Sequence, residues 1–488
     1  MTFPQIIQGG MGVAVSGWQL ALSVSKRGQI GVVSGTALDL VITRRLQLGD
    51  PGGHLRRALA AFPNQDIANY VADRYFIEGG KAPDKPYKSK PIIDHNPRRR
   101  AQELLVVSNF VEVFLAKEGH DGLVGINYLH KIQTPTMPSI YGAILAGVDI
   151  IIVGAGIPLE IPGIIDRLVQ HEPVEMKLHV KTTEGTRIDR ITFDPKLIFE
   201  ESRPPEKRPS FFPIVSSATL ATLMVKKCDG GVNGLIIEGP TAGGHNAPPR
   251  GRPNLNEIGE PIYGPRDDID LDSIGSHGIP FFLAGSYGSP DGLVRARAAG
   301  AAGIQVGTLF AFCEESGLRP DLKHETIAKC KAGTASVFTD PIASPTGFPF
   351  KVLSMAGTAS EEDVYESRSR VCDLSYLREA FEKEDGTIGW RCSADDEKMY
   401  VRNRGKLEDT VGRKCLCNGL MANIGMGQLR KNNVEEVPLL TCGDGVSSIL
   451  KIIKPGESTY SSSDVIDFLL NGSESSMTAR ATAHQATS

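Results

Sequence analysis

Short apolar runs that each end in glycine or a polar residue recur through the first two thirds of the chain, and a segment of helical pattern follows each of them. Repeated β–α units of this kind are typical of folds built on a parallel sheet. We find eight runs, at residues 5–8, 31–34, 124–128, 149–154, 212–216, 234–238, 279–285 and 303–310. Eight parallel strands favour an α/β fold of the (β/α)8 TIM-barrel class.

The spacing of the runs is uneven, because about ninety residues separate the second from the third. No barrel connection needs that length, so we predict an insertion after the second strand, at about residues 40–120. Its Pro- and Lys-rich part, residues 81–91, reads as a surface loop. A helical stretch at residues 98–117 is expected to return the chain to the barrel.

The β–α rhythm stops after about Phe338, so residues 1–338 are expected to form the barrel domain. Residues 339–471 carry short helical patterns, among them 375–383 and 409–421, and are predicted to be a helical C-terminal extension. Residues 472–488 are rich in Ser, Thr and Ala without periodicity, which is typical of a disordered tail.

Composition and charge exclude several functions. The net charge of -4 offers no basic field, so nucleic acid is not an expected partner. No apolar run is long enough to span a bilayer, and no signal peptide is visible at the N-terminus. Eight scattered cysteines look like reduced thiols. We expect a soluble, cytoplasmic protein without a membrane partner, and a homodimer is the default expectation for its size.

The ends of the seventh and eighth runs suggest an anion site. In a barrel the active site lies at the C-terminal ends of the strands, and phosphate commonly binds after strands seven and eight. The seventh run ends in Gly285 and Ser286, and the eighth contains Gly307 and Thr308. Their backbone N–H groups and hydroxyls are suited to hold a phosphate at a helix N-terminus.

The first and third runs each bring a candidate ligand contact to the barrel mouth. The first ends in a glycine-rich turn with Gly10 and Met11, where a flat aromatic ring could lie; the alternative is a tight turn with Met11 filling the core. Asn127 stands in the third run where an apolar residue is expected, so its amide either caps the strand end or hydrogen-bonds a ligand.

His245 follows the sixth run in a loop with Ala242 and Gly243. A histidine on a loop is usually structural, but the flanking glycines let a ligand approach the backbone closely and favour a catalytic role here. Its imidazole titrates near neutral pH, so it is suited to remove an acidic C–H proton or to supply a proton to a carbanion.

The cysteines of the extension raise the question of a metal site. Cys415, Cys417 and Cys442 have a spacing that suits zinc poorly, because zinc sites prefer pairs separated by two to four residues. We interpret them as free buried thiols, with Cys372 and Cys392 in the same class, and expect no metal.

Four motifs resemble those of the nitronate monooxygenase family, formerly called 2-nitropropane dioxygenases. They are QGGMG at residues 8–12, GPTAGGHN at 239–246, AGSYG at 284–288 and GIQVGT at 303–308. The resemblance covers roughly residues 3–312, apart from the insertion. It implies an FMN-dependent TIM barrel that oxidises alkyl nitronates or nitroalkanes with O₂ to a carbonyl compound and nitrite.

The resemblance also implies a role for each matching residue. Gly10 and Met11 would line the flavin ring, and Asn127 would hydrogen-bond the cofactor. His245 matches the family's catalytic histidine. Ala242 and Gly243 would pack near the flavin. The FMN phosphate would be held by four residues, Gly285, Ser286, Gly307 and Thr308.

Three departures from the family pattern leave alternatives open. Thr241 stands where the family usually has Glu, and residues 154–158 look more like flavin-dependent enoyl-thioester reductases. The C-terminal extension is also longer than a compact nitronate oxidiser needs. The alternative function is therefore an FMN- and NAD(P)H-dependent enoyl-thioester (enoyl-acyl-carrier-protein) reductase, with NAD(P)H as a further ligand. A catalytically silent binding subunit is a third possibility.

Overall fold

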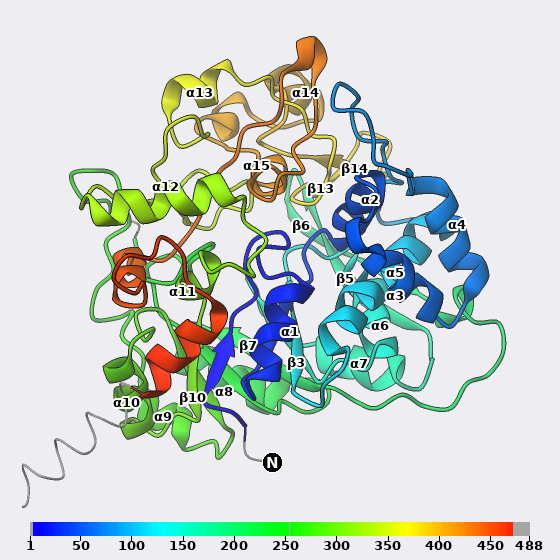
Figure 1. Ribbon diagram of the computed structural model, residues 1–488. Helices are drawn as coiled ribbons and strands as arrows, with labels where there is room; N and C mark the ends of the chain where they lie inside the picture. The colour runs from blue at the N-terminus through cyan, green and yellow to red at the C-terminus, as the bar shows by residue number, and fades with distance from the viewer. Residues whose placement is uncertain (1–2, 253, 472–488) are drawn as a thin grey trace, which may run out of the picture.

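The computed structural model describes residues 3–252 and 254–471 (Figure 1). Eight strands form one sheet in which every neighbouring pair is parallel. In spatial order they are β1 (Ile6–Gln8), β10 (Gly303–Val306), β9 (Phe281–Ala284), β8 (Leu235–Glu238), β7 (Ser210–Val215), β4 (Ile150–Gly154), β3 (Val124–Leu129) and β2 (Gly31–Ser34). A parallel bridge between Ile7 and Ile30 joins the two end strands. The predicted (β/α)8 barrel is confirmed.

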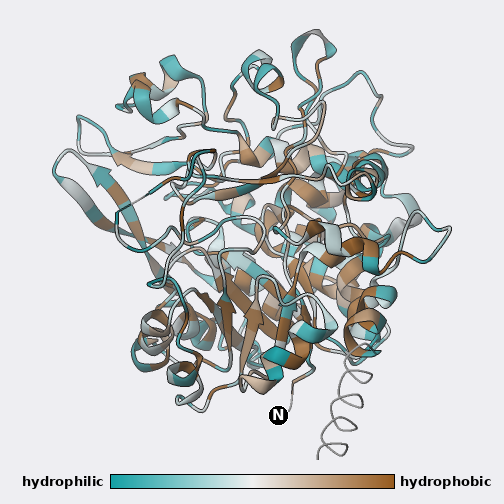
Figure 2. Ribbon diagram, turned by 90° about the vertical axis from the view of Figure 1, so that its left-hand side faces the viewer, coloured by the Kyte–Doolittle hydropathy of each residue, from teal (hydrophilic) through white to brown (hydrophobic). Residues whose placement is uncertain are grey.

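Alternate residues of the strands fill the inside of the barrel. This inner layer contains Phe212 and Phe282, whose rings stack with centroids 6.0 Å apart, and the ring of Phe3 stands edge-on to both. The intervening residues of the same strands face the helices and join a second, larger cluster. Figure 2 shows these strands as apolar along their length. Because the interior is packed with side chains, a ligand site must lie at an end of the barrel.

Helices surround this sheet in the order expected of β–α units. They are α1 (Trp18–Lys26), α2 (Leu38–Gln47), α6 (Thr136–Leu145), α7 (Ile161–Leu168), α8 (Ala218–Lys227), α9 (Leu271–Gly275), α10 (Pro290–Ala298), α11 (Thr308–Ala311) and α12 (Pro320–Lys331). Serine side chains cap two of them: Ser217 accepts from the Leu220 N–H and Ser289 from the Gly292 N–H, both at 3.0 Å. Each cap satisfies a backbone donor that the first helical turn leaves free.

The predicted insertion after β2 contains η1 (Pro51–Gly53), α3 (His54–Ala61), α4 (Gln65–Tyr75), an irregular stretch and α5 (Arg99–Lys117). The helix expected at residues 98–117 is therefore present. α5 is buried along most of its length, including the carboxylate of Glu112. That carboxylate pairs with Arg45 at 2.9 Å and accepts the Trp18 N–H at 3.0 Å, which satisfies a charge that would be costly to bury alone.

A hairpin between α7 and β7 was not anticipated from the sequence. β5 (Val174–Thr182) and β6 (Gly185–Phe193) pair antiparallel, and η2 (Pro195–Leu197) follows them. In β5 buried and exposed residues alternate strictly, which is the signal of a half-buried strand. β5 also pairs in parallel with β13 (Glu379–Glu382), which pairs with β14 (Ile388–Arg391). The C-terminal extension thus adds two strands to this hairpin.

The extension contains the short helices α13 (Glu362–Ser367), α14 (Glu397–Arg402) and α15 (Leu416–Asn423), of which α15 overlaps the stretch expected at residues 409–421, and the 3-10 turns η3 (Leu407–Thr410), η4 (Lys431–Asn433) and η5 (Val446–Lys451). It also contains strands. β11 (Val337–Asp340) crosses the predicted boundary at residue 338 and pairs with β12 (Phe350–Leu353). Residues 375–383, expected to be helical, include β13, because pairing with β5 and β14 overrides the local pattern. The tail predicted at residues 472–488 lies outside the described residues.

A buried cluster joins the barrel, the insertion and the extension. Asp39 of α2 pairs with Lys90 of the insertion at 2.7 Å, and both side chains are at most 5% exposed. The Tyr376 hydroxyl of the extension donates to the same carboxylate. In Figure 1 the part of the extension that contains α13, α14 and α15 lies over the end of the barrel opposite the N-terminus, and its last, red segment lies beside the barrel near α10. Within residues 3–252 and 254–471, no helix has the length and hydropathy that a membrane crossing requires.

Candidate active site

A cavity of about 430 Å³ lies at the C-terminal ends of the barrel strands, between the barrel and the extension. Turns that follow β1, β3, β8, β9 and β10 supply one side, and residues of the extension supply the other. All ten site residues predicted from the sequence line this cavity: Gly10, Met11, Asn127, Ala242, Gly243, His245, Gly285, Ser286, Gly307 and Thr308. The structure therefore brings together side chains that are up to about 300 residues apart.

Close approach of the first turn to β3 forms one wall. A Cβ atom on Gly10 would lie 2.4 Å from the Asn127 Cβ, so only glycine fits there. The Asn127 amide lines the cavity and makes no hydrogen bond to another described residue. Met11 is partly buried beside Gly307 and also faces the cavity. Of the alternatives weighed for Asn127 and Met11, contact with a ligand agrees best with these positions.

The turn after β9 has the geometry of an anion site. Gly285 and Ser286 both have left-handed backbone angles, with φ of 82° and 60°. No hydrogen bond from the N–H groups of residues 285–288 to any other described residue is found. Successive free N–H groups in such a turn bind anions, and helix α10 begins a few residues later.

Thr308 lies at the corresponding turn after β10. Its hydroxyl oxygen accepts the Gly443 N–H at 2.9 Å, so the turn is fixed to the extension. The hydroxyl hydrogen is left to donate to a ligand. Ser286 is held in a similar way, because its hydroxyl donates to the Thr241 hydroxyl at 2.8 Å.

The extension also supplies a basic residue that the sequence did not reveal. Lys451, at the end of η5, is the one Lys or Arg among the cavity-lining side chains of the described chain, and Ser448 lies one turn before it. No described carboxylate pairs with Lys451. η5 packs against α11, which begins at Thr308. A cation in a cavity that also has free backbone N–H groups suits a phosphate ligand.

We predict that Lys451→Gln raises the dissociation constant for FMN about tenfold, which corresponds to about 1.4 kcal/mol for one lost charge-assisted contact. The measurement is titration of the apoprotein with FMN, followed by quenching of flavin fluorescence. Lys398→Gln, on the exposed face of α14, is the matched control and should bind FMN like the wild type. Equal affinities in both variants would place the phosphate elsewhere.

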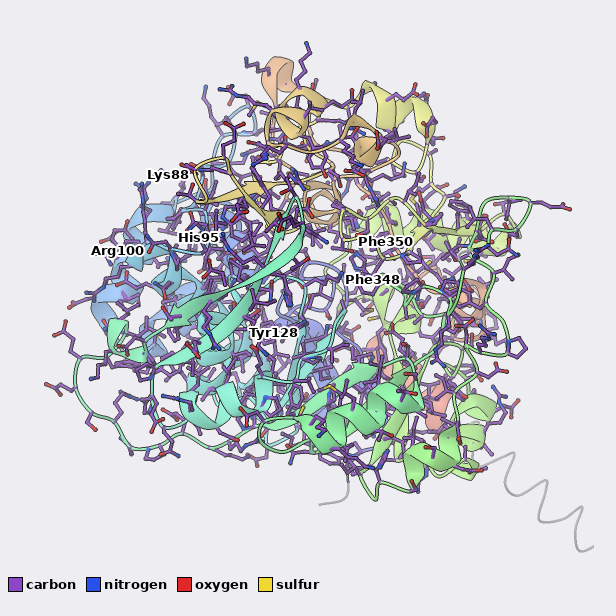
Figure 3. The ribbon with its side chains drawn as sticks, turned by 180° about the vertical axis from the view of Figure 1, so that it is seen from behind. Lys88, His95, Arg100, Tyr128, Phe348 and Phe350 are labelled. Atoms are coloured by element: carbon purple, nitrogen blue, oxygen red, sulfur yellow. The ribbon has the colours of Figure 1, made fainter. Side chains whose placement is uncertain are left out.

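His245 is held in a loop that is fixed to the extension. The Asn246 N–H donates to the Pro349 carbonyl, and the Lys351 N–H donates to the Gly244 carbonyl, both at 3.0 Å. The His245 ring stands edge-on to Phe350 at 4.9 Å, and its Nε2 lies 2.7 Å from the Ser344 hydroxyl. Figure 3 shows Phe348 and Phe350 close together between the barrel and the extension.

Burial, with a smaller effect of Lys131, lowers the pKa of His245 to about 4. The imidazole is therefore neutral at physiological pH. A neutral imidazole carries one N–H and one lone pair, and Ser344 engages only one ring nitrogen. The geometry suits a residue that accepts a proton from a ligand in the cavity.

Glu238 is a second titratable group that sequence analysis missed. It is the last residue of β8, and its side chain lines the cavity. Burial raises its pKa to about 8, so the carboxyl is largely protonated at neutral pH. A carboxyl at the end of an otherwise apolar strand was the signal that could have identified it. The cavity therefore holds a neutral base and a neutral acid.

Gln305 of β10 adds evidence that the cavity receives a polar ligand. Its side-chain oxygen is buried, makes no hydrogen bond within the described chain, and belongs to a residue that lines the cavity. Buried polar atoms without partners are rare in folded proteins. A ligand donor in the cavity would satisfy this oxygen.

Comparison with known proteins finds one matching family model. Residues 160–342 match the family model described as nitronate monooxygenase. That segment runs from just before α7 to just beyond β11 and includes the loop of His245. The match confirms the relationship that the motifs predicted and assigns this protein to the oxidoreductases. No curated protein sequence matches the chain.

Several solved structures are similar in fold at low identity. FabK from Thermotoga maritima is 16% identical, with a TM-score of 0.48 over 99% of this chain and 96% of that one. A nitroalkane oxidase from Streptomyces ansochromogenes is 12% identical, with a TM-score of 0.48 over 98% of each chain. The enoyl reductase domain of MlnA from Bacillus amyloliquefaciens is 12% identical, with a TM-score of 0.47 over 98% of this chain and 95% of that one.

Proposed function

We propose that this protein is an FMN-dependent enzyme that oxidises alkyl nitronates and nitroalkanes with O₂ to a carbonyl compound and nitrite. The observation that carries the proposal is a neutral, oriented histidine, His245, in the cavity that also holds a free anion-binding turn at residues 285–288. The family match over residues 160–342 supports the same reaction class.

The residues of the cavity fit FMN. Residues 285–288, Thr308 and Lys451 would hold the phosphate, since they supply free N–H groups, a hydroxyl and a cation. Gly10 and Gly243 let backbone approach the ring, and Gln305 and Asn127 offer amides to its polar edge. When bound, FMN supplies an acceptor for the substrate's electrons.

His245 would act on the substrate as a general base. The α-hydrogen of a nitroalkane is acidic, and a neutral imidazole can remove it to give the nitronate. Burial lowers the basicity of the ring, but the nitronate it forms is an anion, which stabilises the imidazolium beside it. The Ser344 hydroxyl, 2.7 Å from Nε2, fixes the orientation of the ring for this transfer.

Glu238 provides the specific observation that favours a second candidate, an NAD(P)H-dependent enoyl-thioester reductase. Reduction of an enoyl thioester leaves an enolate that needs a proton, and a carboxyl whose pKa is about 8 can supply one at neutral pH. The same neutral carboxyl also suits nitronate oxidation, because it avoids placing a second negative charge beside the anionic substrate.

Anaerobic stopped-flow spectroscopy of the FMN-loaded protein distinguishes the two functions. Under the proposed function, an alkyl nitronate bleaches the flavin absorbance and NADPH does not. Bleaching by NADPH alone would replace the proposal with the enoyl reductase. Bleaching by neither reagent would contradict both and favour a binding subunit.

We predict an alkaline limb in the pH profile of nitronate oxidation. Glu238 is neutral below its pKa of about 8 and negative above it, so the affinity for the anionic nitronate should fall as pH rises through about 8. Measured between pH 6 and 10, kcat/KM should decline at the alkaline end in the wild type and not in Glu238→Gln. An unchanged decline in the variant would assign the limb to another group.

A further inference from the structure

Four cysteines of the extension surround a small pocket beside the main cavity. Cys372, Cys392, Cys415 and Cys417 all line this pocket, whose volume is about 10 Å³. They come from three separate segments: the approach to β13, the residue after β14, and the start of α15. Cys417 also lines the main cavity. The proposed function uses none of these thiols.

Two of the four, Cys372 and Cys392, are linked through Asp395. Both thiols line the small pocket and lie close enough to shift each other's pKa. Asp395 joins their backbones, because its carboxylate accepts the Cys372 N–H at 2.9 Å and its own N–H donates to the Cys392 carbonyl at 3.0 Å. The two cysteines are therefore held side by side at one small pocket, and a disulfide requires such proximity.

The surroundings make the two thiols unequal. Cys372 is partly exposed, whereas Cys392 is 7% exposed. The neighbouring Cys392 thiol, and more weakly the guanidinium of Arg378, lower the pKa of Cys372. The neighbouring Cys372 thiol and burial raise the pKa of Cys392. Arg378 is fixed there by the carbonyls of Ser375 and Ile93. A partly exposed, activated thiol next to a buried partner is typical of a redox-active pair.

A metal site is the other use of clustered cysteines. Among residues 3–252 and 254–471, no three or more His, Cys, Asp or Glu side chains are arranged to hold an ion. The Cys415 sulfur accepts a hydrogen bond from the Asn418 amide at 3.5 Å. The observations therefore favour a pair of thiols over a shared ion.

We propose that Cys372 and Cys392 form a redox-active dithiol that closes to a disulfide, with a hydroperoxide as oxidant. The Cys372 thiolate attacks an oxygen of hydrogen peroxide and breaks the O–O bond, so Cys372 becomes a sulfenic acid. The released hydroxide takes a proton and leaves as water. The Cys392 sulfur then attacks that sulfur, the S–S bond forms, and a second water leaves with the Cys392 proton. Two thiols lose two electrons and one peroxide gains two.

The position of the pair connects it to the main cavity. Leu374 and Leu377, which follow Cys372, line both the small pocket and the main cavity, as do Leu416 and Cys417. Closing the disulfide draws the segment after Cys372 toward Cys392. Oxidation is therefore expected to change the shape of the cavity wall formed by the extension.

Peptide mapping of the full-length protein tests the proposal. The protein is treated with one equivalent of hydrogen peroxide, its remaining thiols are alkylated, and it is digested with trypsin. The expected product links residues 371–378 to residues 392–398 with the loss of two hydrogens, and dithiothreitol releases it. Residues 415–430 carry Cys415 and Cys417 on one peptide, so a bridge to either is distinguished by mass.

Variants and elemental analysis complete the test. Cys372→Ser and Cys392→Ser should each abolish the link. Cys228→Ser is the control and should leave the link intact, because Cys228 lies at the C-terminal end of α8 and does not line the small pocket. The wild-type map does not depend on whether the variants fold. A link involving other cysteines, four unmodified thiols after peroxide, or about one equivalent of zinc or iron that protects all four from alkylation would overturn the proposal. None of these results depends on the substrate of the main cavity.

Discussion

Replacement of His245 by alanine is expected to lower turnover of neutral nitroalkanes by about 10²- to 10⁴-fold, the usual contribution of a positioned general base. The side chain of His245 lines the cavity, is neutral because its pKa is lowered to about 4, and is oriented by Ser344 at 2.7 Å. Alanine removes the lone pair that would accept the α-proton. The measurement is kcat/KM for a nitroalkane under air, with flavin content determined from absorbance.

Measuring kcat/KM of the same variant for a preformed nitronate separates proton removal from anion binding. The nitronate has already lost its proton, so His245→Ala should affect it much less than the neutral nitroalkane. His277→Ala is the control, because His277 contacts Thr222 and does not line the cavity. Equal losses on both substrates would mean that His245 binds the anion and does not act as a base. Wild-type rates on both would remove it from the mechanism.

Replacement of Gly243 by valine is expected to abolish FMN binding and to lower thermal stability. Even a Cβ atom at this position would lie 2.8 Å from the Cys442 carbonyl carbon and 2.9 Å from the Gly443 nitrogen. Both are backbone atoms, so they cannot move aside as a side-chain end can. Overpacking of this kind typically costs about 1–3 kcal/mol. Because Gly443 also donates to Thr308, displacement of this segment disrupts the proposed phosphate site.

Flavin absorbance of the purified variant and its thermal unfolding measure this effect. Gly231→Ala is the matched control, because nothing lies within 4 Å of a Cβ added there. The control should keep both the flavin and the melting temperature. If Gly243→Val retained a stoichiometric flavin, residues 441–443 would not form a wall of the cofactor site.

The two predictions point to the same property of the molecule: the extension completes the active site. Ser344 and Phe350 contact the His245 ring, and Lys451 stands at the proposed phosphate site. Lys351 pairs with Asp444 at 2.7 Å and so joins two segments of the extension near the cavity. A barrel without residues 339–471 would keep the glycine turns and lose the groups that orient and enclose the ligand.

The local pattern of apolar runs and glycines in the sequence was sufficient to predict the barrel. Each of the eight strands overlaps a predicted run, and α5 lies in the predicted helical stretch, because apolar runs punctuated by glycine carry their own signal. The site residues near the strand ends followed from the same logic, since a barrel places those ends at one face. Their roles toward FMN and substrate remain predictions.

The sequence by itself determined the barrel, the long insertion after β2 and ten of the residues that line the cavity, because periodicity and turn chemistry depend on neighbouring residues. Only the tertiary structure decided what depends on distant segments. The pairing of β13 with β5, the contact of Ser344 with His245, and the adjacency of Cys372 and Cys392 all join residues far apart in the chain. The protonation of Glu238 and His245 likewise depends on burial, which no local pattern of residues records.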